Sequence, residues 1–331
     1  MKRFLIFLLT VLLMAGCSSE QNNWYVTVDG QDLATKTLSR NGVVYVSAGE
    51  IEAALGTKPE EIQTVTISGK SWYDLYELCE TFELSVLEDE DQERLYCTSG
   101  ILGLDIPEGY SVPVIMYHGV SDDVWGSTDM FLSPSDMEDQ LRYLVENGYD
   151  PIWFEDLAQV ADYDKPVLLT FDDGYICNYQ TLYPMLKKYN VKVTISIVTS
   201  SMSNRPTSMT KEMVRELADS GLVSIQSHTV NHKTLPQCDR KTKEYEIIQS
   251  KLEVARITGR EPLLLCYPGG GYDDEVLEIA KDHYRFAITG KDITYVTGTD
   301  PLQIPRYSVY RGKTMEQFTD MLDSVEYLQA K

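Results

Sequence analysis

From residue 112 onward, short apolar runs alternate with longer segments in which apolar residues recur at helical spacing. The runs predicted to be strands are 112–117, 167–171, 193–198, 222–227 and 263–267. The predicted helices between and after them are 134–147, 178–189, 211–220, 243–257 and 274–282. Repeated strand–helix alternation is typical of parallel strands joined by helical crossovers. The pattern therefore predicts an α/β domain over 112–331, built on a parallel sheet or barrel.

Residues 24–98 follow a different pattern. Residues 24–28 alternate like a strand and end at Asp29-Gly30, a turn signal. A second strand at 43–46 and a helix at 48–55 follow, and a similar strand–helix pattern begins again at Trp72. These features predict a small α+β domain. It resembles the copper amine oxidase N-terminal-like domain, which implies a spacer or glycan-proximal module, and its lack of histidine argues against a metal there.

The segment 99–111 contains three glycines and a proline and has no strong periodicity, so we predict a linker.

The first residues are typical of an export signal. Lys2 and Arg3 precede an apolar run over 4–15, which is shorter than the ~20 residues that a membrane-spanning helix needs. The small residues before Cys17 resemble a bacterial lipobox. The resemblance implies a signal peptide at 1–16, lipidation of Cys17 and a tether at 17–23. It also implies anchoring at the extracellular face of the bacterial cell membrane. A plain signal peptide with an incidental cysteine is the alternative.

The net charge of −22 argues against nucleic acid or an anionic membrane surface as a partner. It suits a substrate that is neutral or becomes cationic, and nothing in the sequence indicates a protein partner. Five cysteines remain besides Cys17, an odd number without CxxC spacing, which argues against a disulfide framework or a cysteine zinc site. Cys79 and Cys97 are close enough in the chain to pair.

Unusual polar or glycine-rich groups follow four of the predicted strands. His118 follows the first strand, Asp172-Asp173-Gly174 the second, His228 the fourth and 268–271 the fifth, and His232 lies four residues beyond His228. Three of the four histidines of the chain lie at these positions. Because the carboxyl ends of parallel barrel strands gather on one face, we expect these residues to converge there.

Two imidazoles at i and i+4 with one carboxylate make a site that suits Zn²⁺, with Co²⁺ or Ni²⁺ as alternatives. The adjacent Asp172 and Asp173 allow one carboxylate to bind the ion while the other acts as a base, and a dication offsets their repulsion. Taken alone, Asp-Asp-Gly is more often a turn, and the histidines could be core or helix-surface residues. The combination on separate strand ends favours a metal site.

Residues 170–175 read TFDDGY and residues 228–232 read HTVNH. They resemble the first two motifs of the polysaccharide deacetylases, which are carbohydrate esterase family 4 with the NodB-homology domain. Residues 267–270, YPGG, resemble a variant of the third motif. The resemblance implies a distorted (β/α) barrel, with Asp172 as the catalytic base. It also implies Asp173, His228 and His232 as metal ligands.

Two departures from the family pattern affect the site. Cys266 stands where the third motif normally has an arginine, and we predict that Arg306 orients the base instead. The usual C-terminal Leu-x-His is absent, but residues 113–118, PVIMYH, resemble the opening strand of the poly-N-acetylglucosamine deacetylase branch. That resemblance implies His118 as the general acid.

We further predict that Gly269 supplies an oxyanion-binding N–H, and that Pro268 and Tyr175 lie beside the substrate. The Gly269–Gly271 run lacks the Lys-Ser/Thr of a phosphate loop, so we predict a turn near the site.

Together these features predict a metal-dependent hydrolase that removes N-acetyl groups from a GlcNAc-containing cell-surface polysaccharide, either an exopolysaccharide or peptidoglycan. An O-acetyl xylan esterase is the second enzymatic hypothesis. A catalytically inactive glycan-binding lipoprotein is the third, and the full set of acid, base and ligand residues argues against it.

Overall fold

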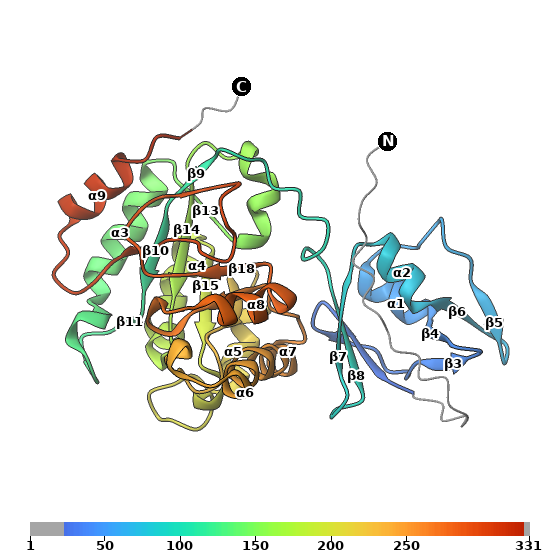
Figure 1. Ribbon diagram of the computed structural model, residues 1–331. Coiled ribbons are helices and arrows are strands. Elements are labelled where there is room, and N and C mark those ends of the chain that lie inside the picture. Colours follow the sequence, from blue (N-terminus) through green and yellow to red (C-terminus); the bar gives the residue numbers. More distant parts are fainter. Residues whose placement is uncertain (1–22, 328–331) are drawn as a thin grey trace.

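The computed structural model describes residues 23–327, which form a larger barrel lobe and a smaller lobe (Figure 1). The predicted signal peptide, the lipidation at Cys17 and nearly all of the tether lie outside the described residues. Within 23–327, no helix is both long and apolar enough to cross a membrane.

The larger lobe is built on an eight-stranded sheet with the order β18-β17-β16-β15-β14-β10-β20, to which β13 adds by pairing with β14. These strands are β10 (Val114–Tyr117), β13 (Asp150–Ile152), β14 (Pro166–Phe171), β15 (Val193–Ile197), β16 (Val223–Ser227), β17 (Leu264–Cys266), β18 (Phe286–Ile288) and β20 (Tyr307–Ser308). Every pairing in this sheet is parallel. The sheet curls into a distorted barrel, which confirms the predicted fold class.

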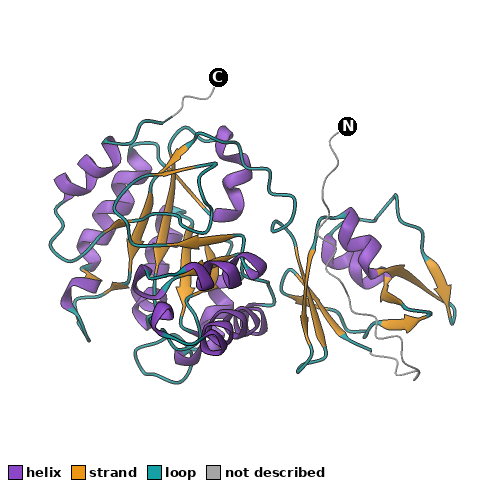
Figure 2. Ribbon diagram, in the orientation of Figure 1, coloured by secondary structure: helices purple, strands orange, loops and turns teal. Residues whose placement is uncertain are grey.

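Helices pack around the outside of the barrel (Figure 2). They are α3 (Pro134–Glu146), α4 (Tyr183–Tyr189), α5 (Lys211–Ala218), α7 (Ser250–Thr258), α8 (Asp274–His283) and α9 (Met315–Asp323). On β14, Val167, Leu169 and Phe171 belong to the core that faces these helices, while Leu168 belongs to a separate core. Because side chains alternate along a strand, Thr170 and Asp172 lie on the same side as Leu168, toward the barrel interior.

The predicted strand 112–117 is interrupted at Pro113. β9 (Ser111–Val112) pairs antiparallel with β19 (Tyr295–Val296), and only β10 joins the barrel. A proline has no N–H to contribute to a strand ladder, so the chain changes partner at this residue.

Two of the predicted helices contain a π-helical turn. The prediction at 178–189 corresponds to η3 (Asn178–Leu182) followed by α4, and the one at 243–257 to α6 (Arg240–Glu244), η6 (Tyr245–Gln249) and α7. In the first case Pro184 has no N–H to donate to the preceding turn, which favours a local widening. The periodicity of apolar residues does not reveal such turns, and they often occur at functional sites.

The smaller lobe holds two four-stranded sheets and two helices. One sheet has the order β2-β1-β8-β7 and the other β3-β4-β6-β5. The elements are β1 (Tyr25–Val28), β2 (Gln31–Asp32), β3 (Leu38–Arg40), β4 (Val43–Ser47), α1 (Ala48–Leu55), β5 (Val65–Ile67), β6 (Lys70–Asp74), α2 (Leu75–Thr81), β7 (Ser85–Asp89) and β8 (Arg94–Thr98). This architecture is α+β, as predicted. Cys79 and Cys97 are free thiols whose sulfur atoms lie 3.9 Å apart, so the predicted pairing is not formed in this structure.

The segment 99–111, predicted to be a linker, packs against the barrel. Its apolar side chains Ile101, Leu104, Ile106 and Tyr110 pack against the core formed by the inner faces of β14 and β17. The connection between the lobes is therefore held against the barrel.

A buried ion pair joins the two lobes. Arg256 on α7 donates from Nε and Nη2 to the two carboxylate oxygens of Asp89, at 2.6 and 2.7 Å, and Asp89 is only 1% exposed. Next to it, the backbone N–H of Gly30 donates to Gly259 O at 3.2 Å. A Cβ on Gly259 would lie 2.6 Å from Gly30 Cα, so glycine is needed for this close approach.

We expect Arg256→Ala to lower the free energy of unfolding by about 3 kcal/mol, because it leaves the Asp89 carboxylate buried without its partner. Urea unfolding followed by circular dichroism measures this loss. Arg142→Ala is the matched control, because Arg142 pairs with Asp139 on the surface, where both side chains are about half exposed. It should cost much less, because exposed ion pairs contribute little to stability, and equal losses in the two variants would contradict the expectation.

Candidate active site

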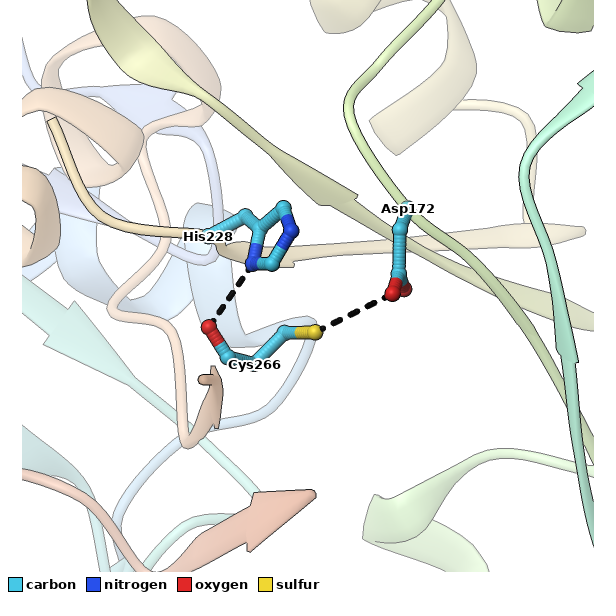
Figure 3. A group of neighbouring side chains, drawn as sticks. All are labelled: Asp172, His228 and Cys266. Atoms are coloured by element: carbon cyan, nitrogen blue, oxygen red, sulfur yellow. Dashed lines mark hydrogen bonds between the residues drawn. The ribbon is translucent and has the colours of Figure 1, made fainter. Parts of the chain in front are cut away.

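Residues from the carboxyl ends of several barrel strands meet at one place. Asp172 follows β14, His228 follows β16, and Cys266 is the last residue of β17; Figure 3 shows the three side chains gathered together. The strands are neighbours or near neighbours in the sheet, and all run in the same direction. The parallel barrel therefore brings together residues that are almost a hundred positions apart in the chain.

Asp173, His228 and His232 form a group that fits a divalent metal ion. Asp173 Oδ1 lies 3.6 Å from Nε2 of His228 and 3.6 Å from Nε2 of His232. Ligand atoms about 2.0–2.2 Å from a tetrahedral ion are roughly 3.4 Å apart, so one ion could contact all three. His228 is 2% exposed but His232 is 45% exposed, which leaves one side of the group open to solvent.

A second contact fixes the tautomer of His228. Its Nδ1 lies 2.7 Å from the carbonyl oxygen of Cys266, as Figure 3 shows. A carbonyl can only accept, so Nδ1 carries the proton and Nε2 keeps a free lone pair. Burial lowers the pKa of His228, which favours this neutral form. Nε2 with its free lone pair thus lies near Asp173, which is the arrangement that a shared metal ion would need.

Asp172, His228 and Cys266 are also close enough to hold an ion, but their contacts argue against it. Asp172 already accepts from a guanidinium on both oxygens. Burial raises the pKa of the Cys266 thiol, which keeps it protonated, and its Sγ lies 3.4 Å from Asp172 Oδ2. A cation here would compete with the adjacent arginine. The group containing Asp173 is the better metal site.

Arg306 holds Asp172 in a bidentate ion pair. Nη1 and Nη2 each lie 2.8 Å from one carboxylate oxygen, and the two residues are 1% and 3% exposed. Burial alone would raise the pKa of Asp172, but the charge of Arg306 and its hydrogen bonds outweigh burial and lower the pKa. The arginine thus keeps a buried carboxylate ionised.

Three non-glycine residues at the site adopt left-handed backbone conformations. They are Asp173 (φ 72°), Thr229 (φ 65°) and His232 (φ 55°). Such conformations cost energy, most of all for a β-branched residue, and persist only where the surroundings enforce them. Here the backbone N–H of His232 donates to Thr229 Oγ1 at 3.1 Å, which closes the turn that carries the second imidazole.

Sequence reasoning missed Glu246, which braces this turn from η6. Its carboxylate is fully buried and accepts from the backbone N–H of Asn231 at 2.7 Å and from Asn231 Nδ2 at 2.8 Å. Asn231 directly precedes His232, so Glu246 acts as a positioning residue for that imidazole. The spacing of residues gives no sign of this contact, because it depends on how η6 packs.

The remaining predicted site residues surround the cluster. His118 follows β10, and burial lowers its pKa while the charges of Asp172 and Asp173 act in the opposite direction, so it lies within electrostatic reach of both. Burial and the nearby charge of Asp173 raise the pKa of the Tyr175 hydroxyl. The N–H groups of Gly270 and Gly271 donate to Tyr267 O and Pro268 O, in a turn where Gly269 has φ 62° and is exposed. The oxyanion role of Gly269 stays a prediction.

Comparison with known proteins agrees with this arrangement. A family model described as polysaccharide deacetylase matches residues 159–285. The crystal structure of a polysaccharide deacetylase from Bacillus cereus superimposes with a TM-score of 0.61 at 31% sequence identity, covering 65% of this chain and 69% of that one. The chain belongs to the polysaccharide deacetylase family. This confirms the predicted family and its enzyme class, a hydrolase of the deacetylase type.

Two curated relatives of this deacetylase chain match over shorter regions. A Bacillus subtilis protein designated a polysaccharide deacetylase is 32% identical over 184 residues, 54% of this chain and 64% of that protein. The poly-β-1,6-N-acetyl-D-glucosamine N-deacetylase of Escherichia coli K12 is 30% identical over 136 residues, 35% of this chain and 20% of that enzyme. The chain thus spans less than two thirds of either relative. The family-model match includes Asp172, Asp173, His228 and His232 but ends before Arg306 and begins after His118.

We expect His232→Ala to weaken zinc binding at least about 100-fold, because it removes one of three ligands. Competition with a chromophoric chelator measures the affinity. His283→Ala is the control, since this fourth histidine lies on α8 and belongs to no metal-binding group among residues 23–327. Unchanged affinity in His232→Ala would contradict the assignment.

Glu246→Ala should lower zinc affinity about tenfold by freeing the turn before His232, and Glu246→Gln should lose less because one acceptor oxygen remains. The same competition measurement applies. Glu244→Gln is the control, because Glu244 is exposed and pairs with Arg240 on the surface. Equal effects of substitutions at the two positions would argue against a positioning role.

Proposed function

We propose that this deacetylase-family chain is a metal-dependent enzyme that removes N-acetyl groups from a GlcNAc-containing polysaccharide. The observation that carries the proposal is the ionised, arginine-bound Asp172 directly beside the Asp173–His228–His232 group. This arrangement pairs a fixed proton acceptor with a site for a Lewis acid.

Asp173, His228 and His232 would hold the ion. When bound, a divalent cation such as Zn²⁺ would polarise the acetyl carbonyl and acidify water at the open side of the group. Co²⁺ and Ni²⁺ are alternatives with the same ligand preferences, and the fit of the three ligand atoms does not separate them.

Asp172 acts as the general base. Arg306 fixes the direction of its carboxylate and keeps it ionised, so it accepts the proton of the attacking water without prior deprotonation. The N–H of Gly269, on an exposed turn, is the proposed donor to the oxyanion, and Pro268 lies within this turn.

His118, which follows β10, acts as the general acid. In its protonated state it gives its proton to the leaving sugar amine, so that acetate and a free amine are formed. Burial lowers the pKa of His118, while the charges of Asp172 and Asp173 act in the opposite direction and favour the protonated imidazole.

The activity for which the Escherichia coli relative is named supports an exopolysaccharide of N-acetylglucosamine as the substrate. Peptidoglycan is the second polymer of the same chemistry. An acidic protein suits either, since both are uncharged at the acetylated sugar and the product amine becomes cationic.

We place the enzyme on the outer face of the cell membrane, held through lipid on Cys17 after cleavage of residues 1–16. The segment 17–23 would form the tether, residues 24–98 a spacer of the copper amine oxidase N-terminal-like type, 99–111 the connection and 112–331 the catalytic domain. The extra length of chain between the anchor and the barrel would let the site reach a polymer outside the membrane.

We expect Asp172→Asn to lower the rate of acetate release about 10²- to 10⁴-fold while zinc affinity is retained, because the base is lost but the ligands remain. Arg306→Lys should lower the rate about 10- to 100-fold, since a lysine cannot replace the bidentate contact. Acetate is measured enzymatically after incubation of the zinc-loaded protein with poly-GlcNAc, peptidoglycan or acetylxylan.

The choice of polymer separates the alternatives. Release from acetylxylan alone would assign an O-acetyl esterase. Zinc binding without release from any of the three polymers would assign a glycan-binding protein. Full activity in Asp172→Asn would contradict the proposed mechanism.

A further inference from the structure

Hydrogen bonds hold together the two ends of a loop beside the candidate active site. It comprises residues 121–130 and connects β11 (Gly119–Val120) with β12 (Phe131–Leu132), which pair with each other. The guanidinium of Arg311 donates to Ser121 O at 2.7 Å and to Phe131 O at 2.8 Å, on the two sides of the loop. The loop is therefore anchored where it leaves the barrel.

Trp125 in this loop belongs to an aromatic group that reaches the metal site. Its ring lies edge-on to Phe131, with centroids 4.9 Å apart, and edge-on to Tyr175 at 6.1 Å. Phe131 and Tyr175 are themselves 5.2 Å apart. Tyr175 lies two residues after Asp173 in the chain, so it connects this aromatic group with the segment that carries a proposed metal ligand.

The indole N–H of Trp125 has no hydrogen-bond partner among the described residues, although its nitrogen is buried. Buried indole N–H groups usually find an acceptor, and contact with the two neighbouring rings would be only a weak substitute. The side chain as a whole is only partly buried, and Val124 and Met130 of the same loop are 38% and 42% exposed. The loop thus offers apolar surface next to the site.

These features suit a pyranose ring. Such a ring has a face of C–H groups that packs on an aromatic side chain, and its rim carries hydroxyl and amide oxygens that accept hydrogen bonds. We infer that Trp125 binds a sugar unit of the polymer next to the unit whose acetyl group is removed. This makes Trp125 a specificity-determining residue for a chain of β-linked N-acetylhexosamine units. The inference rests on the proposed function for its substrate class.

Binding of the pentamer of β-linked N-acetylglucosamine tests the inference without turnover. We expect the zinc-loaded Asp172→Asn protein to bind the pentamer more tightly than N-acetylglucosamine itself, by isothermal titration calorimetry. Adding Trp125→Ala should weaken pentamer binding about fivefold to tenfold, and Trp125→Phe should restore part of it, because a ring face returns without the N–H. Zinc affinity should stay unchanged in both.

Val124→Ala is the matched control on the same loop, and it should leave pentamer binding unchanged. The inference is overturned if the Asp172→Asn protein binds no pentamer, or if Trp125→Ala binds it as tightly as the parent. It is also overturned if Trp125→Ala and Val124→Ala weaken binding equally, or if Trp125→Ala loses zinc affinity in parallel. Acetate release by the wild-type protein is measured separately. Its absence together with Trp125-dependent pentamer binding would reject the proposed function and keep the inference.

Discussion

The ion pair between Arg306 and Asp172 is the interaction on which the rest of the site depends. Both groups are almost completely removed from solvent, and a buried charge without a partner would be strongly unfavourable. Arg306 also donates to Thr289 O at 2.9 Å and to Thr170 Oγ1 at 3.0 Å, and Nη2 lies 3.4 Å from Cys266 Sγ. One side chain thus links the carboxyl ends of β14 and β17 with the residue that follows β18. It thereby fixes the direction of the Asp172 carboxylate, the proposed catalytic base.

The replacement of the third-motif arginine by Cys266 has a physical explanation in this network. A guanidinium reaches Asp172 from residue 306, so a second one from residue 266 would compete for the same two oxygens. A small buried thiol fills the remaining space and contacts both partners of the ion pair. The backbone carbonyl of the same residue orients His228. Position 266 therefore contacts the proposed metal ligand His228 through its main chain and the proposed base Asp172 through its side chain.

Two of the proposed metal ligands, Asp173 and His232, are held by strained backbone rather than by rigid secondary structure. Asp173 and His232 both lie in turns with positive φ, outside the strands themselves. Thr229 Oγ1 and the Glu246 carboxylate accept hydrogen bonds from the backbone N–H groups of His232 and Asn231, which braces this turn and restricts the direction of the His232 imidazole. The anchored 121–130 loop places the ring of Trp125 against Tyr175, two residues from Asp173.

Local sequence patterns determined the elements and much of the chemistry of this protein. The alternation of strands and helices predicted the parallel α/β architecture, and polar residues at the strand ends indicated which face would carry the site. The pattern could also nominate Arg306, as the arginine of a late strand, but not show that it meets Asp172. Only the tertiary structure decided that contact, along with the bracing of Asn231 by Glu246, the packing of Trp125 on Tyr175 and the Arg256–Asp89 link. The physical reason is separation along the chain. Periodicity and capping are set by neighbours a few residues apart. These contacts join residues 15 to 167 positions apart, so they depend on the register and curvature of the whole barrel.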